Sequence, residues 1–196
     1  MTKNVDFYFD FGSPAAYLAF TQLPTICTDA GATLTWKPML LGGVFQATGN
    51  HSPATIAAKG KYMRDDLPRF ARRYGVPFQH NPHFPINTLT LMRAATGLQL
   101  RGDPRFESFL KTVFEAVWVQ GLNLNDLAVT GAALHAAGFD PAAMLALTSQ
   151  QDVKDRLKAL TQGAVERGIF GAPTMFVGDA MFWGQDRLDF VRDALR

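Results

Sequence analysis

The stretch DFGSP at residues 10–14 places a hydroxyl where the sequence changes from a strand pattern to a helix pattern. Residues 5–9 before it form a short aromatic and β-branched run, which favours a strand. Ser13-Pro14 combines a capping residue with a proline at the first helical position. Such a helix start can hold a carboxylate, a phosphate or a thiolate. Ser13 is therefore the first candidate functional residue; the alternative is a plain helix cap that contributes about 1 kcal/mol.

The sequence WGQDR at residues 183–187 opens the last expected helix and forms a second candidate site. The N-terminus of this helix would be a second site at the positive end of a helix dipole, and Asp186 could cap it and accept a hydrogen bond from an ammonium group. Together these features suit the head group of an α-amino acid. The alternative is a capping turn without a ligand.

The first part of the sequence predicts a strand, a helix and a second strand, over residues 5–11, 14–30 and 33–38. We expect Pro24 to kink or interrupt the helix, because proline has no N–H and clashes with the preceding turn. Two strands joined by such a helix are parallel when they share a sheet, so the pattern predicts a βαβ unit.

Strand patterns return near the C-terminus, over residues 174–177 and 180–182. Gly178-Asp179 between them favours a two-residue hairpin turn. A short helix over 187–195 follows. We expect the strands from both ends of the sequence to pair in one α/β core, which would bring the two candidate turns together.

Residues 42–167 carry helical patterns instead, and several of the expected helices start at Ser-Pro or Asp-Pro pairs. The expected helices cover 53–74 with a break near Pro68, 88–100, 104–119, 126–137, 141–147 and 151–167. We expect an inserted all-helical subdomain at 42–167 and a discontinuous core made of residues 1–41 and 168–196.

Composition limits the classes of function. At 196 residues the chain can bury one sizeable core and is short for two independent domains. Its 19 Lys and Arg against 17 Asp and Glu give a net charge of +2, which offers no reason to expect nucleic acid or an anionic membrane as a partner. No stretch approaches the roughly 18 apolar residues of a membrane span, and no signal peptide is visible. We expect a cytoplasmic protein.

Cys27 is the only cysteine, which excludes an intramolecular dithiol centre. Its position inside the first expected helix favours a small core residue over a nucleophile. His80 and His83 have the spacing of a metal-binding pair, yet no cysteine or acidic ligand is near them in the sequence. We expect a surface loop there and no metal site.

Four stretches of the sequence form a pattern in a fixed order: the Ser-Pro turn, FPINT at 84–88 with LMR at 91–93, FGAPTMFV at 170–177, and WGQDR at 183–187. Together they resemble the 2-hydroxychromene-2-carboxylate isomerases, and more distantly the kappa-class glutathione transferases and the DsbA-like oxidoreductases. The resemblance spans almost the whole chain, in order. It implies an α/β fold of the DsbA and kappa-class type: a thioredoxin-like core with a large all-helical insertion. DsbA-like enzymes carry a C-x-x-C pair where this chain has SPAA at 13–16, so both sulfurs are missing.

The resemblance also implies glutathione as the cofactor. Pro173 is expected in the cis form, so that Ala172 pairs with the cysteinyl backbone of glutathione as an added strand would. Ser13 would stand beside the sulfur, where a hydroxyl and a helix N-terminus favour the thiolate. The γ-glutamyl end would be held by Trp183, Gly184, Gln185 and Asp186.

The helical segments would line the substrate side of the cleft, with Asn50, Lys59 and Asn87 as its polar candidates. Lys59 or Lys61 could hold a carboxylate, and the resemblance favours Lys59, although most helical lysines simply face water. Asn87 could instead be only the cap of the helix that follows it.

The activity implied is the interconversion of 2-hydroxychromene-2-carboxylate and trans-o-hydroxybenzylidenepyruvate in aromatic, naphthalene-type catabolism, through transient addition of the glutathione thiolate. Its partners would be a small aromatic carboxylate, glutathione and a second copy of the chain. Two alternatives stay open. One is a kappa-like transferase that conjugates glutathione to electrophiles, and the other is a non-catalytic peptide-binding protein that kept the groove.

Overall fold

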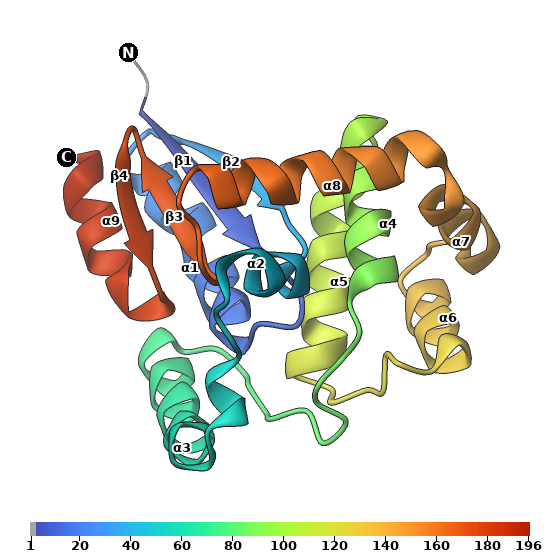
Figure 1. Ribbon diagram of the computed structural model, residues 1–196, viewed down its shortest axis with the longest axis horizontal. Coiled ribbons are helices and arrows are strands. Elements are labelled where there is room, and N and C mark those ends of the chain that lie inside the picture. The colour runs from blue at the N-terminus through green and yellow to red at the C-terminus, as the bar shows by residue number, and fades with distance from the viewer. Residues whose placement is uncertain (1–2) are drawn as a thin grey trace.

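A four-stranded mixed sheet forms the centre of the protein in the computed structural model, which describes residues 3–196 (Figure 1). The strands are β1 (Asn4–Phe9), β2 (Thr33–Pro38), β3 (Thr174–Val177) and β4 (Ala180–Trp183), in the spatial order β2-β1-β3-β4. β1 runs parallel to β2 and antiparallel to β3, so that Phe7 lies between Trp36 and Met175. The expected βαβ unit and the pairing of strands from both ends of the sequence are confirmed.

Helices cover both faces of this sheet. The first face carries α1 (Pro14–Asp29) and α9 (Leu188–Leu195), and the second carries α2 (Leu41–Thr48) and α8 (Gln151–Glu166). Figure 1 shows α8 crossing in front of the sheet and continuing to the helices beyond it. This helix therefore connects the sheet to the helical part of the chain.

The helices expected between residues 53 and 167 are present, with shifted ends. They are α3 (Ala57–Tyr74), α4 (Leu89–Leu100), α5 (Phe106–Trp118), α6 (Leu127–Ala136) and α7 (Pro141–Ser149). A 3-10 turn, η1 (Pro53–Thr55), precedes α3, and another, η2 (Gln185–Arg187), precedes α9. Among residues 3–196, no helix combines the length and the apolar character that a membrane crossing needs.

Aromatic side chains pack the end of β1 against α5. The rings of Phe9 and Phe11 lie 5.9 and 4.9 Å from the ring of Phe114, measured between centroids. Trp118 is buried, and its indole N–H donates to the carbonyl of Phe11 at 2.8 Å. Because Phe11 directly precedes the Ser13 turn, this core holds that turn in a fixed place.

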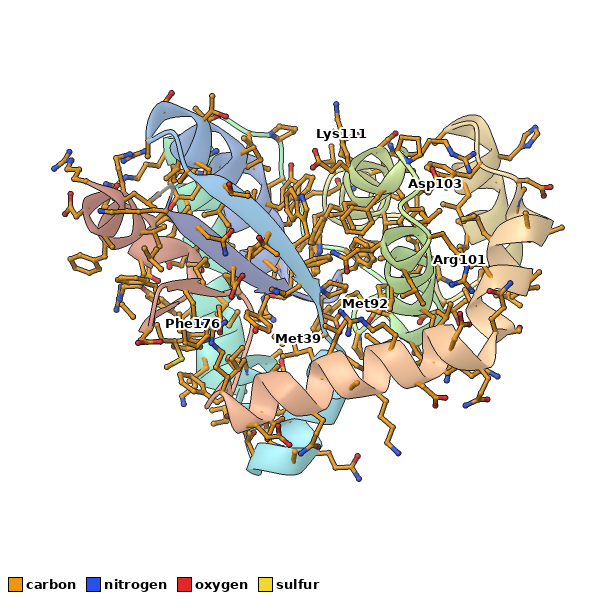
Figure 2. All side chains as sticks on the ribbon, turned by 90° about the horizontal axis from the view of Figure 1, so that it is seen from above. Met39, Met92, Arg101, Asp103, Lys111 and Phe176 are labelled. Atoms are coloured by element: carbon orange, nitrogen blue, oxygen red, sulfur yellow. The ribbon has the colours of Figure 1, made fainter. Side chains whose placement is uncertain are left out.

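A smaller core lies on the opposite face, beneath α8. Figure 2 shows Met39 and Phe176 on this side of the sheet, and both are buried. Arg167, directly after α8, lies over the Phe176 ring at 3.7 Å and pairs with Asp6 of β1 at 2.6 Å. The end of α8 is thereby attached to two neighbouring strands.

The helix α2 differs from the sequence prediction, which placed the first inserted helix only at residue 53. Gly42 and Gly43 lower the intrinsic helix propensity of this segment. The helix forms because Val44 is buried in the core beneath α8. Gly43 also approaches α8 so closely that a Cβ there would lie 3.1 Å from Cγ2 of Thr161. Tertiary packing therefore overrides local propensity here.

Prolines shift the helix boundaries less than predicted. A kink or an interruption was expected at Pro24 and a break near Pro68, yet α1 and α3 continue through these residues without interruption, and the break lies instead at Ile56, between η1 and α3. Buried neighbours such as Leu23 and Leu67 hold each helix against the core, which offsets the one hydrogen bond that a proline removes.

Candidate functional site

Ser13 is the N-cap of α1, as the Ser-Pro pair predicted. Its hydroxyl oxygen accepts the N–H of Ala16 at 3.1 Å and donates to the carbonyl of Ala172 at 2.9 Å. The side chain is nearly buried, with 5% of the residue exposed. A plain cap accounts only for the first of these bonds. The second joins Ser13 to a loop that is 159 positions away in the sequence.

The loop before β3 contains the Ala172-Pro173 peptide bond, which is cis, as expected. The carbonyl of Pro173 accepts the N–H of Gly184 at 3.0 Å. Because β3 pairs antiparallel with β1, the loop before β3 stands beside the turn after β1. The structure thus joins Ser13, the cis-proline loop and the 183–186 turn through consecutive hydrogen bonds.

The turn at residues 183–186 requires glycine at its second position. Gly184 has a φ of +101°, and a Cβ on it would lie 2.5 Å from Oδ1 of Asp186. The expectation that Asp186 caps the last helix is wrong: it lies within η2, and neither η2 nor α9 has a side-chain cap bond at its start. Its carboxylate pairs with Arg187 at 2.6 Å and keeps 39% of its side chain exposed.

Tyr74, at the end of α3, fixes the backbone of the same turn, and the sequence assigned it no such role. Its hydroxyl donates to the carbonyl of Gln185 at 2.5 Å. Burial is the main cause that raises the pKa of Tyr74 to about 12, so the donating proton stays in place at neutral pH. The two residues are 111 positions apart, which is why no local pattern indicated the contact.

Trp183 and Asn50 both contact the segment before the cis-proline. The Trp183 ring packs against Phe170 with 5.1 Å between centroids, and 45% of Trp183 is exposed. A Cβ on Gly171 would lie 2.7 Å from the indole nitrogen of Trp183, so the small residue makes room for this ring. The Asn50 amide donates to the carbonyl of Phe170 at 2.8 Å. The structure therefore brings Asn50 to the same loop as Ala172.

The other two predicted polar residues make no such hydrogen bond to the cis-proline loop in the described chain. Lys59 and Lys61 are both exposed on the first turns of α3. The side-chain oxygen of Asn87 accepts the N–H of Leu89 at 3.2 Å, but the N-cap of α4 is Thr88, whose side chain makes no cap hydrogen bond, so the alternative that Asn87 is the N-cap is wrong. Within residues 3–196, no direct hydrogen bond or ion pair joins Lys59 or Asn87 to Ser13 or Ala172. A ligand contact by Lys59 or Asn87 stays a prediction.

Asp10 is a buried residue of this region to which the sequence analysis gave no role. Its carboxylate is 1% exposed and accepts the N–H of Gly12, the hydroxyl of Thr88 and the N–H of Leu41, at 2.8, 2.7 and 2.8 Å. Burial raises the pKa of Asp10 above its ordinary value, and the three hydrogen bonds partly oppose that shift. The only feature of the sequence that could have indicated a role for Asp10 is its position as an acidic residue directly after an aromatic strand.

The described side chains that could hold a metal ion or supply a thiol are those of His, Cys, Asp and Glu. In the part of the chain that the structure describes, no group of three or more His, Cys, Asp or Glu side chains is arranged to hold a metal ion. Cys27 is buried in the core, as expected, and burial raises its pKa to about 11. Its thiol is therefore protonated and a poor nucleophile at neutral pH.

The arrangement suits a peptide-like ligand that carries a polar head group. The Ala172 carbonyl beside a cis-proline can accept a backbone N–H, the Ser13 hydroxyl and the start of α1 favour an anion, and the Asp186 carboxylate can accept from an ammonium. At Gly171 and Gly184 the space that a Cβ would take is occupied by the Trp183 ring and the Asp186 carboxylate, so these glycines let both side chains lie close to the loop backbone. These residues fit a thiol peptide.

Comparison with known proteins places the chain among thioredoxin-fold proteins. Residues 4–196 match the model of the DSBA-like thioredoxin domain. The 2-hydroxychromene-2-carboxylate isomerase of Sphingobium xenophagum is 35% identical, with 100% of this chain and 99% of that protein covered. The enzyme of the same name from Pseudomonas putida is also 35% identical, over 97% and 93% of the two chains.

A solved structure of a 2-hydroxychromene-2-carboxylate isomerase superposes with a TM-score of 0.84 at 33% identity, covering 98% of this chain and 94% of that one. Human glutathione S-transferase kappa 1 is 26% identical, over 100% of this chain and 92% of that protein. The expected fold, a thioredoxin-like α/β core with helical insertions, is confirmed.

Proposed function

Because the chain belongs to the DSBA-like thioredoxin family, and within it to the 2-hydroxychromene-2-carboxylate isomerases, we propose that it is a glutathione-dependent isomerase. The reaction we propose interconverts 2-hydroxychromene-2-carboxylate and trans-o-hydroxybenzylidenepyruvate. When bound, glutathione would supply a thiolate that adds reversibly to a conjugated C=C bond of the substrate, which would become a rotatable single bond until elimination of the thiolate restored the double bond.

The observation that carries this proposal is the hydrogen bond from Ser13 to the Ala172 carbonyl at 2.9 Å. Ser13 has one hydroxyl proton, which the Ala172 carbonyl accepts. If a ligand N–H replaced the hydroxyl at this carbonyl, the hydroxyl would donate to a nearby anion instead. Binding of the glutathione backbone at Ala172 would therefore also make the Ser13 hydroxyl available to donate to the glutathione sulfur.

The residues of the 183–186 turn would hold the amino-acid end of glutathione. Asp186 keeps an exposed carboxylate for an ammonium group, while Arg187 beside it is a cation at the same edge. Tyr74 and Gly184 maintain the backbone shape of the turn. Trp183 would form an apolar wall.

The substrate half of the cleft is assigned to the helical segments. Asn50 already contacts the Phe170 carbonyl and would orient the loop, whereas Lys59 and Asn87 would provide charge and amide contacts to the substrate carboxylate. We further propose a cytoplasmic location, on the single cysteine of the sequence, and a homodimer, which is carried over from the family resemblance.

Calorimetric titration with glutathione tests the site before any turnover assay. Ser13→Ala and Asp186→Ala should both weaken binding, and Ser13→Ala should lower isomerisation by roughly 10- to 100-fold, the loss of one hydrogen bond to a charged group. Ser13→Thr keeps a hydroxyl and is the matched control. Wild-type protein that fails to bind millimolar glutathione would refute the proposal.

A glutathione transferase is the second candidate, because the kappa-class enzymes also align along the full chain. The two activities differ in what happens to the thiol. An isomerase leaves total free glutathione constant while substrate is converted, whereas a transferase consumes one thiol for each electrophile. Thiol quantification during turnover separates them.

A further inference from the structure

Asp10 joins three segments that are far apart in the sequence. Its donors are the N–H of Gly12, in the Ser13 turn, the N–H of Leu41, the first residue of α2, and the hydroxyl of Thr88, the residue that precedes α4. All three donors are neutral, so the carboxylate is held in the interior by hydrogen bonds alone. A carboxylate is costly to bury, and hydrogen bonds to it are strong and directional.

One of these segments closes a ring of contacts around the proposed glutathione site. Leu41 begins α2, and this helix ends just before Asn50, which donates to the carbonyl of Phe170. Two residues later, the Ala172 carbonyl accepts the Ser13 hydroxyl. Asp10 therefore supports both sides of the cis-proline loop.

The other segment belongs to the substrate half. Thr88 follows Asn87 directly and is 6% exposed, while Asn87 itself is exposed. The Thr88 hydroxyl on Asp10 is thus an anchor that places the Asn87 segment relative to the Ser13 turn. Ser13 and Asn87 share no direct hydrogen bond in the described chain, so Asp10 links the two halves of the proposed cleft.

We propose that Asp10 is a positioning residue, which fixes the Asn87 segment against the Ser13 turn and thereby sets the affinity for the organic substrate. This proposal rests on the proposed function and extends it. Asp10 itself touches neither substrate nor glutathione in this assignment. Its effect on the substrate passes through Thr88.

Thr88→Val tests this link, because valine keeps the shape of threonine and removes the hydroxyl. We expect the KM for 2-hydroxychromene-2-carboxylate to rise about 10-fold, as one hydrogen bond to a charged group is lost, with the glutathione Kd changed less than 2-fold. Thr88→Ser should restore the KM. The matched control is Thr96→Val within α4, since Thr96 is also buried and its hydroxyl donates to the Met92 carbonyl of its own helix.

Two results would overturn the proposal. One is a Thr88→Val protein with the same KM as Thr96→Val, which would leave Asp10 a purely structural residue. The other is a rise in the glutathione Kd as large as the rise in KM. Asp10→Asn provides a second route: if Asp10 acts through Thr88, the effects of Asp10→Asn and Thr88→Val on KM should not add.

Amide hydrogen exchange separates this proposal from the proposed function. In the ligand-free protein, Thr88→Val should raise exchange in the peptides around residues 87–92, and Thr96→Val should not. Should the wild type fail to isomerise the chromene, the proposed function is wrong and the exchange data still decide on Asp10. Unchanged exchange in Thr88→Val would overturn the anchor.

Discussion

At the scale of single residues, two side chains of the site differ in how many hydrogen bonds they share: the Ser13 hydroxyl has one proton to donate, and the Asp10 carboxylate accepts from three donors. The Ser13 hydroxyl can donate only once, so the proton that it gives to the Ala172 carbonyl must be redirected before Ser13 can donate to a bound anion. Asp10 shows the opposite case, in which one carboxylate satisfies three donors.

Stability of the protein should depend on pH through Asp10. Burial raises its pKa above the ordinary value of 3.8, so the folded protein binds this proton more tightly than the unfolded chain does. The resulting stabilisation is complete below pH 3.8 and is lost as the pH rises through the raised value. The free energy of unfolding of the wild type, relative to Asp10→Asn, should therefore increase as the pH falls through the raised pKa towards 3.8. Urea unfolding at several pH values measures this difference, and a flat or reversed trend would contradict it.

At the scale of elements, helix packing decides where a glycine is required. Gly97 of α4 faces α7, and a Cβ there would lie 2.6 Å from Cγ of Leu147. Gly163 of α8 is the matched control, because a Cβ there would have no other atom within 4 Å. Both glycines lie inside helices, where glycine costs about 0.5–1 kcal/mol relative to alanine.

The two glycine-to-alanine variants should therefore change stability in opposite directions. Gly163→Ala should stabilise the protein by about 0.5–1 kcal/mol, and Gly97→Ala should destabilise it by about 1–3 kcal/mol through overpacking. In a Leu147→Ala background the penalty of Gly97→Ala should disappear. Denaturant unfolding of the wild type and the four variants tests this, and equal effects at both glycines would show that α4 and α7 move apart at no cost in stability.

At the scale of the whole molecule, one core joins the sheet to the inserted helices. Trp36 of β2 donates to Glu107 of α5 at 3.0 Å, and Trp118 of α5 donates to the carbonyl of Phe11 at 2.8 Å. The main hydrophobic cluster contains residues of the strands and of most helices. The division into a discontinuous core and a subdomain at 42–167 stays a prediction about the chain's organisation.

This shared core predicts that sheet and helices unfold together. Near-ultraviolet circular dichroism reports the buried tryptophans, and far-ultraviolet circular dichroism reports the helices, so the two thermal transitions should coincide. A tryptophan signal that disappears before the helical signal would show instead that the helical part unfolds separately.

The sequence by itself determined the features that depend on neighbouring residues. The cap at Ser13, the Gly178-Asp179 hairpin, the parallel βαβ unit and the buried Cys27 all follow from local residue types and spacing, and all are present. The family resemblance added the cis form of Pro173.

Only the tertiary structure decided which distant groups meet. Packing formed α2 despite its glycines and carried helices through Pro24 and Pro68. It also placed Thr88 on Asp10 and Tyr74 on Gln185, which are 78 and 111 positions apart. No local pattern encodes such pairs, because a hydrogen bond depends on where two chain segments lie in space, and that is fixed by the burial of apolar side chains across the whole fold.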